Sequence, residues 1–212
     1  MSMNQPKPIR VLLVDDHSIV RIGLRGVLDL EPDLAVVAEA EDGAQAVDLF
    51  REHRPDVTLM DLRMPGMDGI ETTRRIHASF PQARILMLTT YDGDHDIQRA
   101  LEAGALGYVL KNVTGDELVR AVRTVHSGQR YLPQAVAARL AEGLARPELT
   151  PREIEVLKFV VKGLSNKEIG DRLQMSEHTA KTHLKSILAK LGARDRTEAA
   201  TSALQRGIVR FD

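Results

Sequence analysis

Short apolar runs and stretches of helical spacing alternate along the first part of the chain, from Ile9 to about Ser127. The runs predict strands buried on both faces, and they cover residues 10–14, 34–40, 57–60, 83–88 and 107–110. The intervening stretches place apolar residues three and four positions apart, which predicts helices, over residues 18–30, 44–52, 70–78, 94–103 and 116–127. Such alternation predicts a doubly wound α/β domain, a (βα)5 fold with one parallel sheet and helices on both faces.

The second part of the chain shows helical spacing alone. Residues 134–145 have this spacing, so we interpret residues 128–148 as a linker that contains one short helix. The sequence Thr150-Pro151-Arg-Glu153 then has the residues of a helix start, with a capping hydroxyl, a proline in the first turn and a glutamate three positions after the threonine. Further helices are predicted at residues 166–173, 177–191 and 195–206. Residues 149–209 therefore form a predicted all-α domain with a helix-turn-helix at its centre.

Composition and charge narrow the class of protein. The chain of 212 residues has no cysteine, which excludes a disulfide framework and thiolate chemistry. No apolar run approaches the roughly 20 residues of a membrane span, and residues 1–8 lack the apolar core of a signal peptide. We therefore expect a cytoplasmic protein with no membrane partner. From Pro151 onward, 12 basic residues outnumber 8 acidic ones, whereas the preceding part has 17 against 22. This asymmetry favours a polyanion as partner of the second domain.

Polar side chains stand at the carboxyl ends of the predicted strands, where open α/β sheets place their chemistry. They are Asp15 and Asp16 after the first strand, Asp61 after the third, Thr89 after the fourth and Lys111 after the fifth. Carboxylates brought together in one crevice repel one another unless a cation neutralises them. Hard oxygen ligands with an open rim suit Mg²⁺. A carboxylate nucleophile, a metal ion, a lysine and a hydroxyl together favour phosphoryl transfer onto an aspartate.

Residues 9–127 resemble the receiver domain of bacterial response regulators. The resemblance rests on the acidic pair, on Asp61 within MDLRMPGMDG, and on Thr89, Tyr108 and Lys111 in that order and spacing. It implies that Asp61 is the phosphoacceptor, and that Pro65-Gly66 shapes the adjacent turn. Thr89 would close onto the phosphoryl group while Tyr108 swings inward, and Lys111 would bind a phosphoryl oxygen.

The resemblance also implies a set of Mg²⁺ ligands. Asp16 and Asp61 would hold the ion together with the backbone carbonyl of Arg63, and Asp15 would act through water. His17 follows the acidic pair directly. We interpret it as the start of the first helix, in preference to a metal ligand.

Residues from Thr150 to about Ile208 resemble the LuxR/FixJ-type four-helix DNA-binding domain, along LTPREIEVLKFVVKGLSNKEIGDRLQMSEHTAKTHLKSILAKLGARDRTEA. Gly170 and Ala180 stand where alanine and valine are common in that family. By position, the residues expected to approach bases in the major groove are Lys181, Thr182 and Lys185. The candidates for contacts to phosphate, or for structural roles, are Ser176, Thr179, His183 and Lys190. The last helix would provide a dimer contact.

Together the two resemblances imply a NarL/FixJ-type two-component response regulator and not an enzyme. A sensor histidine kinase would phosphorylate Asp61, the helix-turn-helix domain would be released, and a homodimer would bind promoter DNA, with RNA polymerase as a further partner.

Two alternatives stay open at this point. The first is a Mg²⁺-dependent phosphatase of the haloacid-dehalogenase type, which needs an acidic residue two positions after its nucleophile. Arg63 occupies that position here, and a guanidinium cannot donate a proton at neutral pH. The second is a DNA-binding protein whose receiver no longer accepts a phosphoryl group, against which the intact acidic set argues.

Overall fold

The computed structural model describes residues 7–90, 93–144 and 147–209 of the chain. Contacts divide the chain into two compact units, one containing residues up to Thr90 with Gln98–Gln134, the other containing Tyr91–Ile97 with Ala135–Asp212. The first 6 residues, on which the expectation about export depends, lie outside the described range. Nor does that range include residues 145 and 146 of the predicted linker. Among the described residues, no helix is long and apolar enough to cross a membrane.

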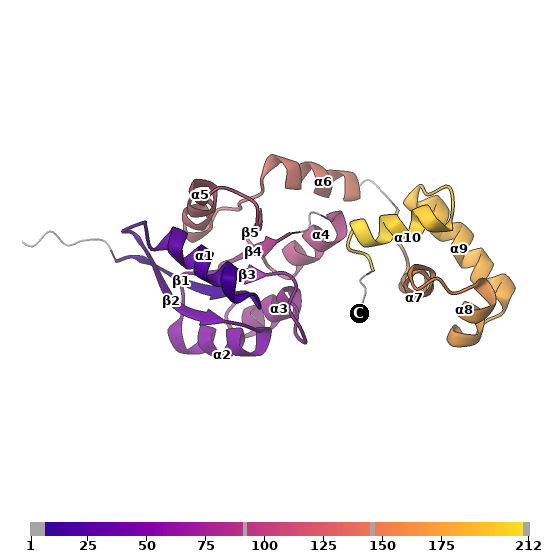
Figure 1. Cartoon of the computed structure of the whole chain (residues 1–212), viewed down its shortest axis with the longest axis horizontal. Helices are drawn as coiled ribbons and strands as arrows, with labels where there is room; N and C mark the ends of the chain where they lie inside the picture. The colour runs from indigo at the N-terminus through magenta and orange to yellow at the C-terminus, as the bar shows by residue number, and fades with distance from the viewer. Residues whose placement is uncertain (1–6, 91–92, 145–146, 210–212) are drawn as a thin grey trace, which may run out of the picture. The chain divides into compact units, whose positions relative to one another are not determined.

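The first unit is built on a parallel sheet of five strands in the order β2-β1-β3-β4-β5 (Figure 1). The strands are β1 Ile9–Val14, β2 Leu34–Ala40, β3 Val57–Asp61, β4 Ile85–Thr89 and β5 Gly107–Leu110. The helices that alternate with them are α1 Ser18–Leu28, α2 Gly43–His53, α3 Gly69–Ser79, α4 Asp94–Glu102 and α5 Gly115–His126. The α/β fold class read from the alternating pattern is therefore confirmed.

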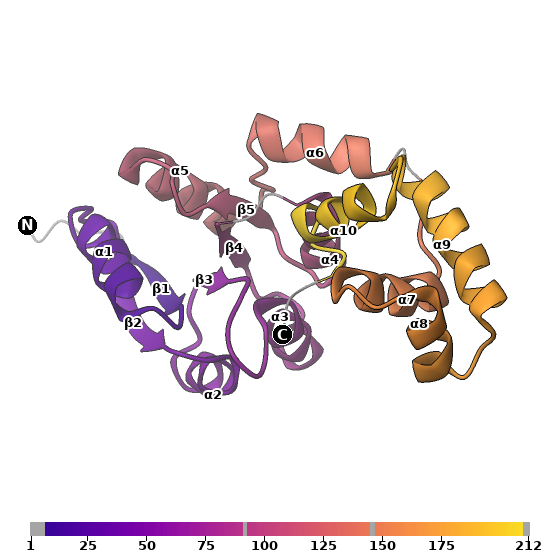
Figure 2. The ribbon, with the colours of Figure 1, turned by 45° about the vertical axis from the view of Figure 1, so that its right-hand side comes forward.

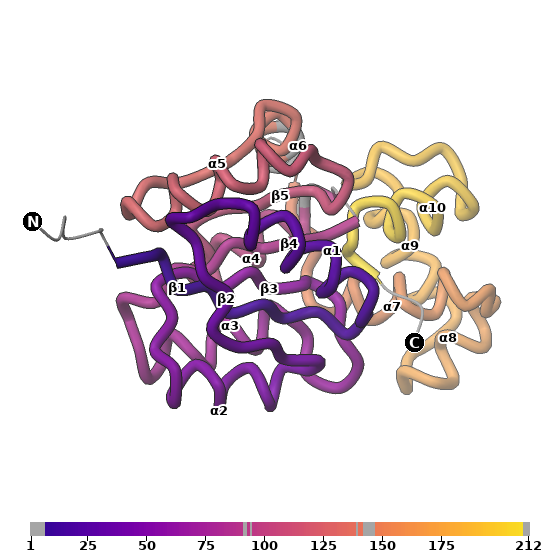
Figure 3. Tube along the Cα trace, turned by 60° about the vertical axis from the view of Figure 1, so that its left-hand side comes forward, coloured from indigo at the N-terminus to yellow at the C-terminus, as the bar shows by residue number. Residues whose placement is uncertain are grey.

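Helices cover both faces of the sheet, with α1 and α5 on one side and α2 and α3 on the other (Figures 1 and 3). All five residues of β3 and of β4 are buried, as continuous apolar runs of central parallel strands require. The core under α1 and α5 joins alternate strand residues such as Leu13, Leu59 and Leu88 to α5 residues such as Val122. This packing fixes the strand ends, and hence the side chains that follow them.

The second unit contains α6 Gln134–Leu144, α7 Pro151–Val161, α8 Asn166–Leu173, α9 Glu177–Leu191 and α10 Arg196–Gln205 (Figure 2). Its core includes Val156, Ile169, Ala180 and Ile187, which are at most 2% exposed, together with other apolar residues of α7–α10. The predicted cap of α7 is present, and α8 has one of the same kind: the hydroxyls of Thr150 and Ser165 accept from the backbone N–H of the glutamate three positions later, whose carboxylate accepts from the backbone N–H of the capping residue. These local bonds explain why both helices begin where the sequence indicated.

A tight turn joins α8 to α9 and completes the predicted helix-turn-helix. Gln174 adopts a left-handed conformation with φ of 54°, which ends α8 and reverses the chain. The turn packs closely on α8, because a side chain at Gly170 would come within 2.7 Å of the Met175 carbonyl oxygen. Gly170, at a position where alanine is common in the family, thus permits this close approach. The predicted domain bounds themselves stay predictions.

Candidate functional site

Two adjacent strands bring the predicted carboxylates together at the carboxyl edge of the sheet. Val14 of β1 pairs with Met60 of β3, so Asp15 and Asp16 emerge beside Asp61. Oxygen atoms of these three carboxylates and a nitrogen of His17 all lie within 4.8 Å of one another. Asp15 is fully buried and Asp61 is 3% exposed, whereas the Asp16 side chain is 24% exposed. The result is an acidic cup, formed by Asp15, Asp16 and Asp61, that opens to solvent on the Asp16 side.

Lys111 supplies the positive charge that the sequence placed at this edge. Its Nζ lies 2.6 Å from Asp15 Oδ2 and 3.0 Å from Asp61 Oδ1, and its side chain is only 13% exposed. The backbone N–H of Lys111 donates to the Thr89 carbonyl oxygen at 2.7 Å, which ties the end of β5 to the end of β4. Lys111 therefore bridges two of the three carboxylates and leaves Asp16 without an ammonium partner among the ion pairs of the cup.

Burial dominates the protonation of the phosphoacceptor candidate. It raises the pKa of Asp61 to about 6, against a weaker lowering by Lys111, while the neighbouring Asp15 charge raises it further. Burial alone would lower the pKa of Lys111, but its hydrogen bond with Asp15 and the charge of Asp61 outweigh burial, so that the pKa is raised. Lys111 thus remains an ammonium at neutral pH, and a further cation near Asp61 would favour its carboxylate form.

The residues present fit a Mg²⁺ ion. Ionised Asp15, Asp16 and Asp61 together with Lys111 leave the cup with an excess negative charge that a divalent cation would balance. Their donors are carboxylate oxygens, which Mg²⁺ prefers, and the partly exposed Asp16 leaves room for the waters that this ion keeps. A backbone hydrogen bond from Arg63 also reaches the Asp61 carboxylate, which places the Arg63 backbone at the rim where its carbonyl is predicted to act.

Local backbone geometry holds Asp61 in place. Gly66 has φ of 74°, a left-handed value that few side chains tolerate, in agreement with the predicted turn at Pro65-Gly66. Gly69 packs so tightly against the carbonyl of Asp61 that any side chain there would collide with it. Thr89 is the last residue of β4 and Tyr108 the second residue of the neighbouring β5, and both are buried, with 1% and 0% exposure. Tyr108 thus already lies inside, and its movement stays a prediction.

The second predicted site lies on α9. Lys181, Thr182 and Lys185 are exposed, while Ala180 and Ile187 on the other side of the helix are fully buried. The helix is therefore amphipathic in the predicted sense, with a basic outer face of the kind that enters a major groove. Ser176 caps α9 by accepting the Thr179 N–H at 3.0 Å.

The other predicted phosphate-contacting or structural residues at the start of α9 and along it are Ser176, Thr179 and His183. The hydroxyls of Ser176 and Thr179 lie 2.8 Å apart, so these two residues have a capping role in the free protein. His183 is half-buried.

Glu153 forms a buried network that the sequence pattern did not predict. Besides capping Thr150, its carboxylate accepts from Ser186 Oγ at 2.6 Å and from Lys190 Nζ at 2.7 Å. Two roles were left open for Lys190, a contact to DNA phosphate and a structural role. The contact with Glu153 supports the structural role, because an ammonium paired with a carboxylate is less available to DNA phosphate. Only the capping pattern with Thr150 was visible in the sequence, since the other partners lie 33 and 37 residues away.

We expect this network to make the second domain sensitive to acid. Burial alone would raise the pKa of Glu153, but hydrogen bonds from Lys190, Ser186 and Thr150 lower it to about 2, from an ordinary value of 4.5. A lowered folded pKa stabilises the protein above pH 4.5, and this contribution is lost as the pH falls toward 2. Glu153→Gln should therefore lower the melting temperature at neutral pH and have a much smaller effect at pH 2 and below. Thermal unfolding of both proteins across this range measures the difference, and an effect independent of pH would contradict the role of the charge.

Lys190→Met should reduce stability without changing the salt dependence of DNA binding, because this lysine is the counterion of Glu153. Removing one partner of a buried pair costs roughly 3–5 kcal/mol when the other charge stays buried. The matched change Lys181→Met should leave stability intact and, if this side chain neutralises one phosphate, reduce the slope of log affinity against log salt by about 1. Chemical unfolding and a salt titration of binding separate the two residues. If the slope of log affinity against log salt decreased equally in both variants, Lys190 would be a DNA-contacting residue.

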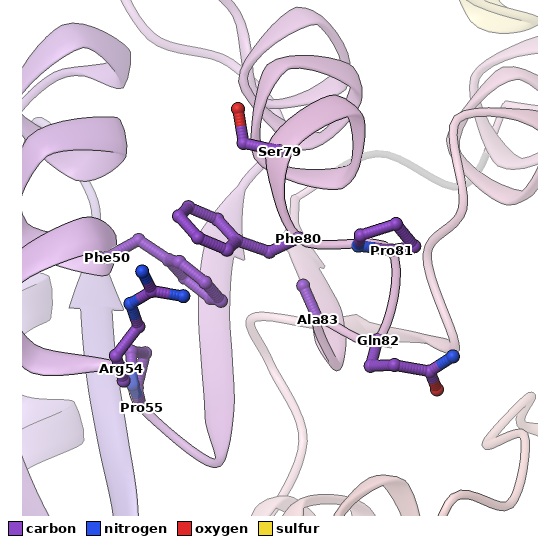
Figure 4. Close-up of a pocket in the computed structure, with 8 residues that line it drawn as sticks. All are labelled: Phe50, Arg54, Pro55, Ser79, Phe80, Pro81, Gln82 and Ala83. Carbon is purple, nitrogen blue, oxygen red and sulfur yellow. The ribbon is translucent and has the colours of Figure 1, made fainter.

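A shallow, open pocket of about 340 Å³ lies at the other end of the sheet from the acidic cup. Its lining residues precede β3 and β4 (Figure 4), whereas the cup lies at the carboxyl ends of β1 and β3. The rings of Phe50 and Phe80 lie 5.1 Å apart between centroids, and the Arg54 guanidinium stacks on Phe80 at 4.0 Å. These stacked side chains line the pocket, and none of its lining residues is a predicted site residue.

Comparisons with known proteins identify the families of both domains. Residues 11–123 match the family described as response regulator receiver domain, and residues 147–203 match that described as bacterial regulatory proteins, luxR family. The transcriptional regulatory protein LiaR of Bacillus subtilis (strain 168) is 42% identical over 209 residues, covering 95% of this chain and 99% of LiaR. LnrK of the same organism, also named a transcriptional regulatory protein, is 41% identical over 219 residues, covering 96% and 100%.

Solved structures give the same result. The response regulator ChrA of a heme-sensing two-component system is 43% identical, with a TM-score of 0.59, and the match covers 96% of this chain and 100% of ChrA. The response regulator RcsB in a complex with DNA is 29% identical, with a TM-score of 0.72, and the match covers 94% and 99%. The curated relatives are named as transcriptional regulators and not as enzymes.

Proposed function

Because the chain belongs to the two-component response regulators that join a receiver domain to a LuxR-type DNA-binding domain, we propose that Asp61 is its phosphoacceptor and that phosphorylation controls its binding to promoter DNA. The observation that carries the proposal is the acidic cup, in which Lys111 contacts both Asp15 and Asp61. A protein that binds promoter DNA acts in the cytoplasm, so we place this protein there.

The chemistry follows from the positions of the side chains. A carboxylate oxygen of Asp61 attacks the phosphorus of a phosphohistidine on a sensor kinase. The new O–P bond forms as the P–N bond breaks, and the departing imidazole keeps the bonding electron pair and takes up a proton. Lys111, already 3.0 Å from Asp61, holds a phosphoryl oxygen, and Thr89 donates its hydroxyl to another. Bound Mg²⁺, held by Asp16, Asp61 and the Arg63 carbonyl with Asp15 acting through water, would neutralise phosphoryl charge.

The phosphoryl group then biases a two-state equilibrium of the receiver. Thr89 ends β4 beside the cup and Tyr108 lies on the neighbouring strand β5, so we expect a bond made at Asp61 to change the surroundings of both side chains. The favoured state releases the DNA-binding domain, which pairs through α10 with a second copy. Such a homodimer places two α9 helices on two half-sites, with Lys181, Thr182 and Lys185 toward the bases. A dimer bound at a promoter would also meet RNA polymerase.

Two experiments separate this function from its alternatives. Incubation with Mg²⁺ and acetyl phosphate should add the mass of one phosphoryl group, read by intact mass spectrometry. Absence of that mass would favour a receiver that no longer accepts a phosphoryl group. A phosphatase would instead turn over small phosphate esters through many cycles, for which Arg63 offers no proton at the position of the general acid.

A further inference from the structure

His17 lies at the edge of the acidic cup, although the sequence favoured a simple helix start. It is the N-cap residue of α1, but its side chain makes no capping hydrogen bond. Its backbone N–H donates instead to Asp15 Oδ1 at 2.9 Å, which fixes the residue beside the carboxylates. The imidazole is therefore not occupied by helix capping, and with 68% of its side chain exposed it can be reached from solvent.

The imidazole nitrogen has the spacing of a metal ligand relative to two carboxylates. His17 Nδ1 lies 2.8 Å from Asp16 Oδ1 and 3.4 Å from Asp15 Oδ1. Adjacent ligands of an octahedral ion with bonds of about 2.1 Å lie about 3 Å apart. When a neutral imidazole carries its proton on Nε2, the Nδ1 lone pair is free to face an ion held by the same oxygens.

We propose that His17 is a nitrogen ligand of the divalent-cation site, and that it makes the site favour transition ions such as Ni²⁺ over Mg²⁺. Imidazole suits nickel, zinc, copper and iron, whereas magnesium prefers oxygen ligands and its own waters. The proposal rests on the proposed function, because it adds a ligand to the metal site of the receiver. Its consequence is that the ion bound to this receiver depends on which divalent metals are available, and not on Mg²⁺ alone.

Calorimetric titration of the full chain with Ni²⁺ and, separately, with Mg²⁺ tests the proposal. The variants are His17→Asn and, as a matched control, His178→Asn, which removes another exposed histidine near the start of a helix. Ni²⁺ that excess Mg²⁺ can displace is assigned to the acidic cup, which separates it from Ni²⁺ bound elsewhere on the chain. In His17→Asn the cup should bind Ni²⁺ at least about tenfold more weakly, since even outer-shell partners of metal ligands cost that much. Mg²⁺ affinity should change less than about twofold, and the control should match the unaltered protein in both.

Two results would overturn the proposal: Ni²⁺ affinity unchanged in His17→Asn, or equal losses for Ni²⁺ and Mg²⁺, which would indicate a purely structural role. Phosphoryl uptake from acetyl phosphate with Mg²⁺, measured on the same His17→Asn sample, separates this outcome from a failure of the proposed function. Phosphoryl uptake in both the unaltered protein and His17→Asn, together with the same Ni²⁺ affinity in both, would refute the nitrogen ligand alone.

Discussion

Asp61→Asn is expected to abolish phosphoryl uptake completely, because the amide that replaces the carboxylate cannot form the acyl phosphate. Intact mass after incubation with Mg²⁺ and acetyl phosphate should show the unmodified chain only. The matched control is Asp48→Asn on α2, which removes a carboxylate whose side chain is 78% exposed. The control should gain one phosphoryl group as the unaltered protein does. A phosphoryl group on the Asp61 variant would place the acceptor elsewhere.

The loss of uptake cannot be ascribed to unfolding, because the Asp61 carboxylate destabilises the metal-free protein at neutral pH. Its folded pKa of about 6 lies above the ordinary value of 3.8, so the stability that it contributes is present below pH 3.8 and lost as the pH rises through 6. We therefore expect Asp61→Asn to melt at a higher temperature than the unaltered protein above pH 6 in the absence of divalent ions. The gain should vanish below the ordinary pKa.

Lys181→Ala and Lys185→Ala are expected to weaken DNA binding by roughly 1–3 kcal/mol for each base-reading side chain removed, or about 5- to 150-fold in affinity. Both side chains are exposed on α9, and neither belongs to the core of the second unit, so the fold should be unaffected. Titration of a labelled operator duplex, selected from random sequence with the phosphorylated protein, measures the change in affinity.

Lys158→Ala provides the comparison, since Lys158 is an exposed lysine of the same unit that lies on α7. It should bind the operator nearly as the unaltered chain does. Full affinity in both α9 variants would exclude α9 as the recognition helix, whatever the stability of the domain.

Most of the fold could be predicted from local pattern. Buried parallel strands appear in the sequence as apolar runs, and helices appear as apolar residues at helical spacing with capping residues at the start. The differences lie at element ends: α1 ends at Leu28 and not at residue 30, and β4 begins at Ile85 and not at residue 83. Asp61 itself is the last residue of β3 and does not follow it. Terminal residues depend on hydrogen bonds with other elements, which apolar periodicity does not report.

The composition of the acidic cup was also predictable, since the carboxyl ends of neighbouring parallel strands must meet. What sequence could not supply were interactions that depend on side-chain direction over long separations. Glu153 reaches Ser186 and Lys190 only because α7 and α9 pack together. The placement of His17 against Asp16 depends on the loop that leads into α1. In the sequence, Glu153 is explained by a helix cap and His17 by a helix start. These local explanations gave no reason to expect a further partner for either residue.

The coupling of the two domains is tested most directly by the affinity of one protein for one operator, before and after phosphorylation. The unaltered chain and Asp61→Asn would be titrated onto the same duplex, with and without prior incubation with Mg²⁺ and acetyl phosphate. Phosphorylation should tighten binding by about 5- to 150-fold, the usual range of coupling between two sites, and Asp61→Asn should show no change. Equal affinity of the phosphorylated and unphosphorylated protein would contradict the claim that phosphorylation of Asp61 controls the binding of α9 to DNA.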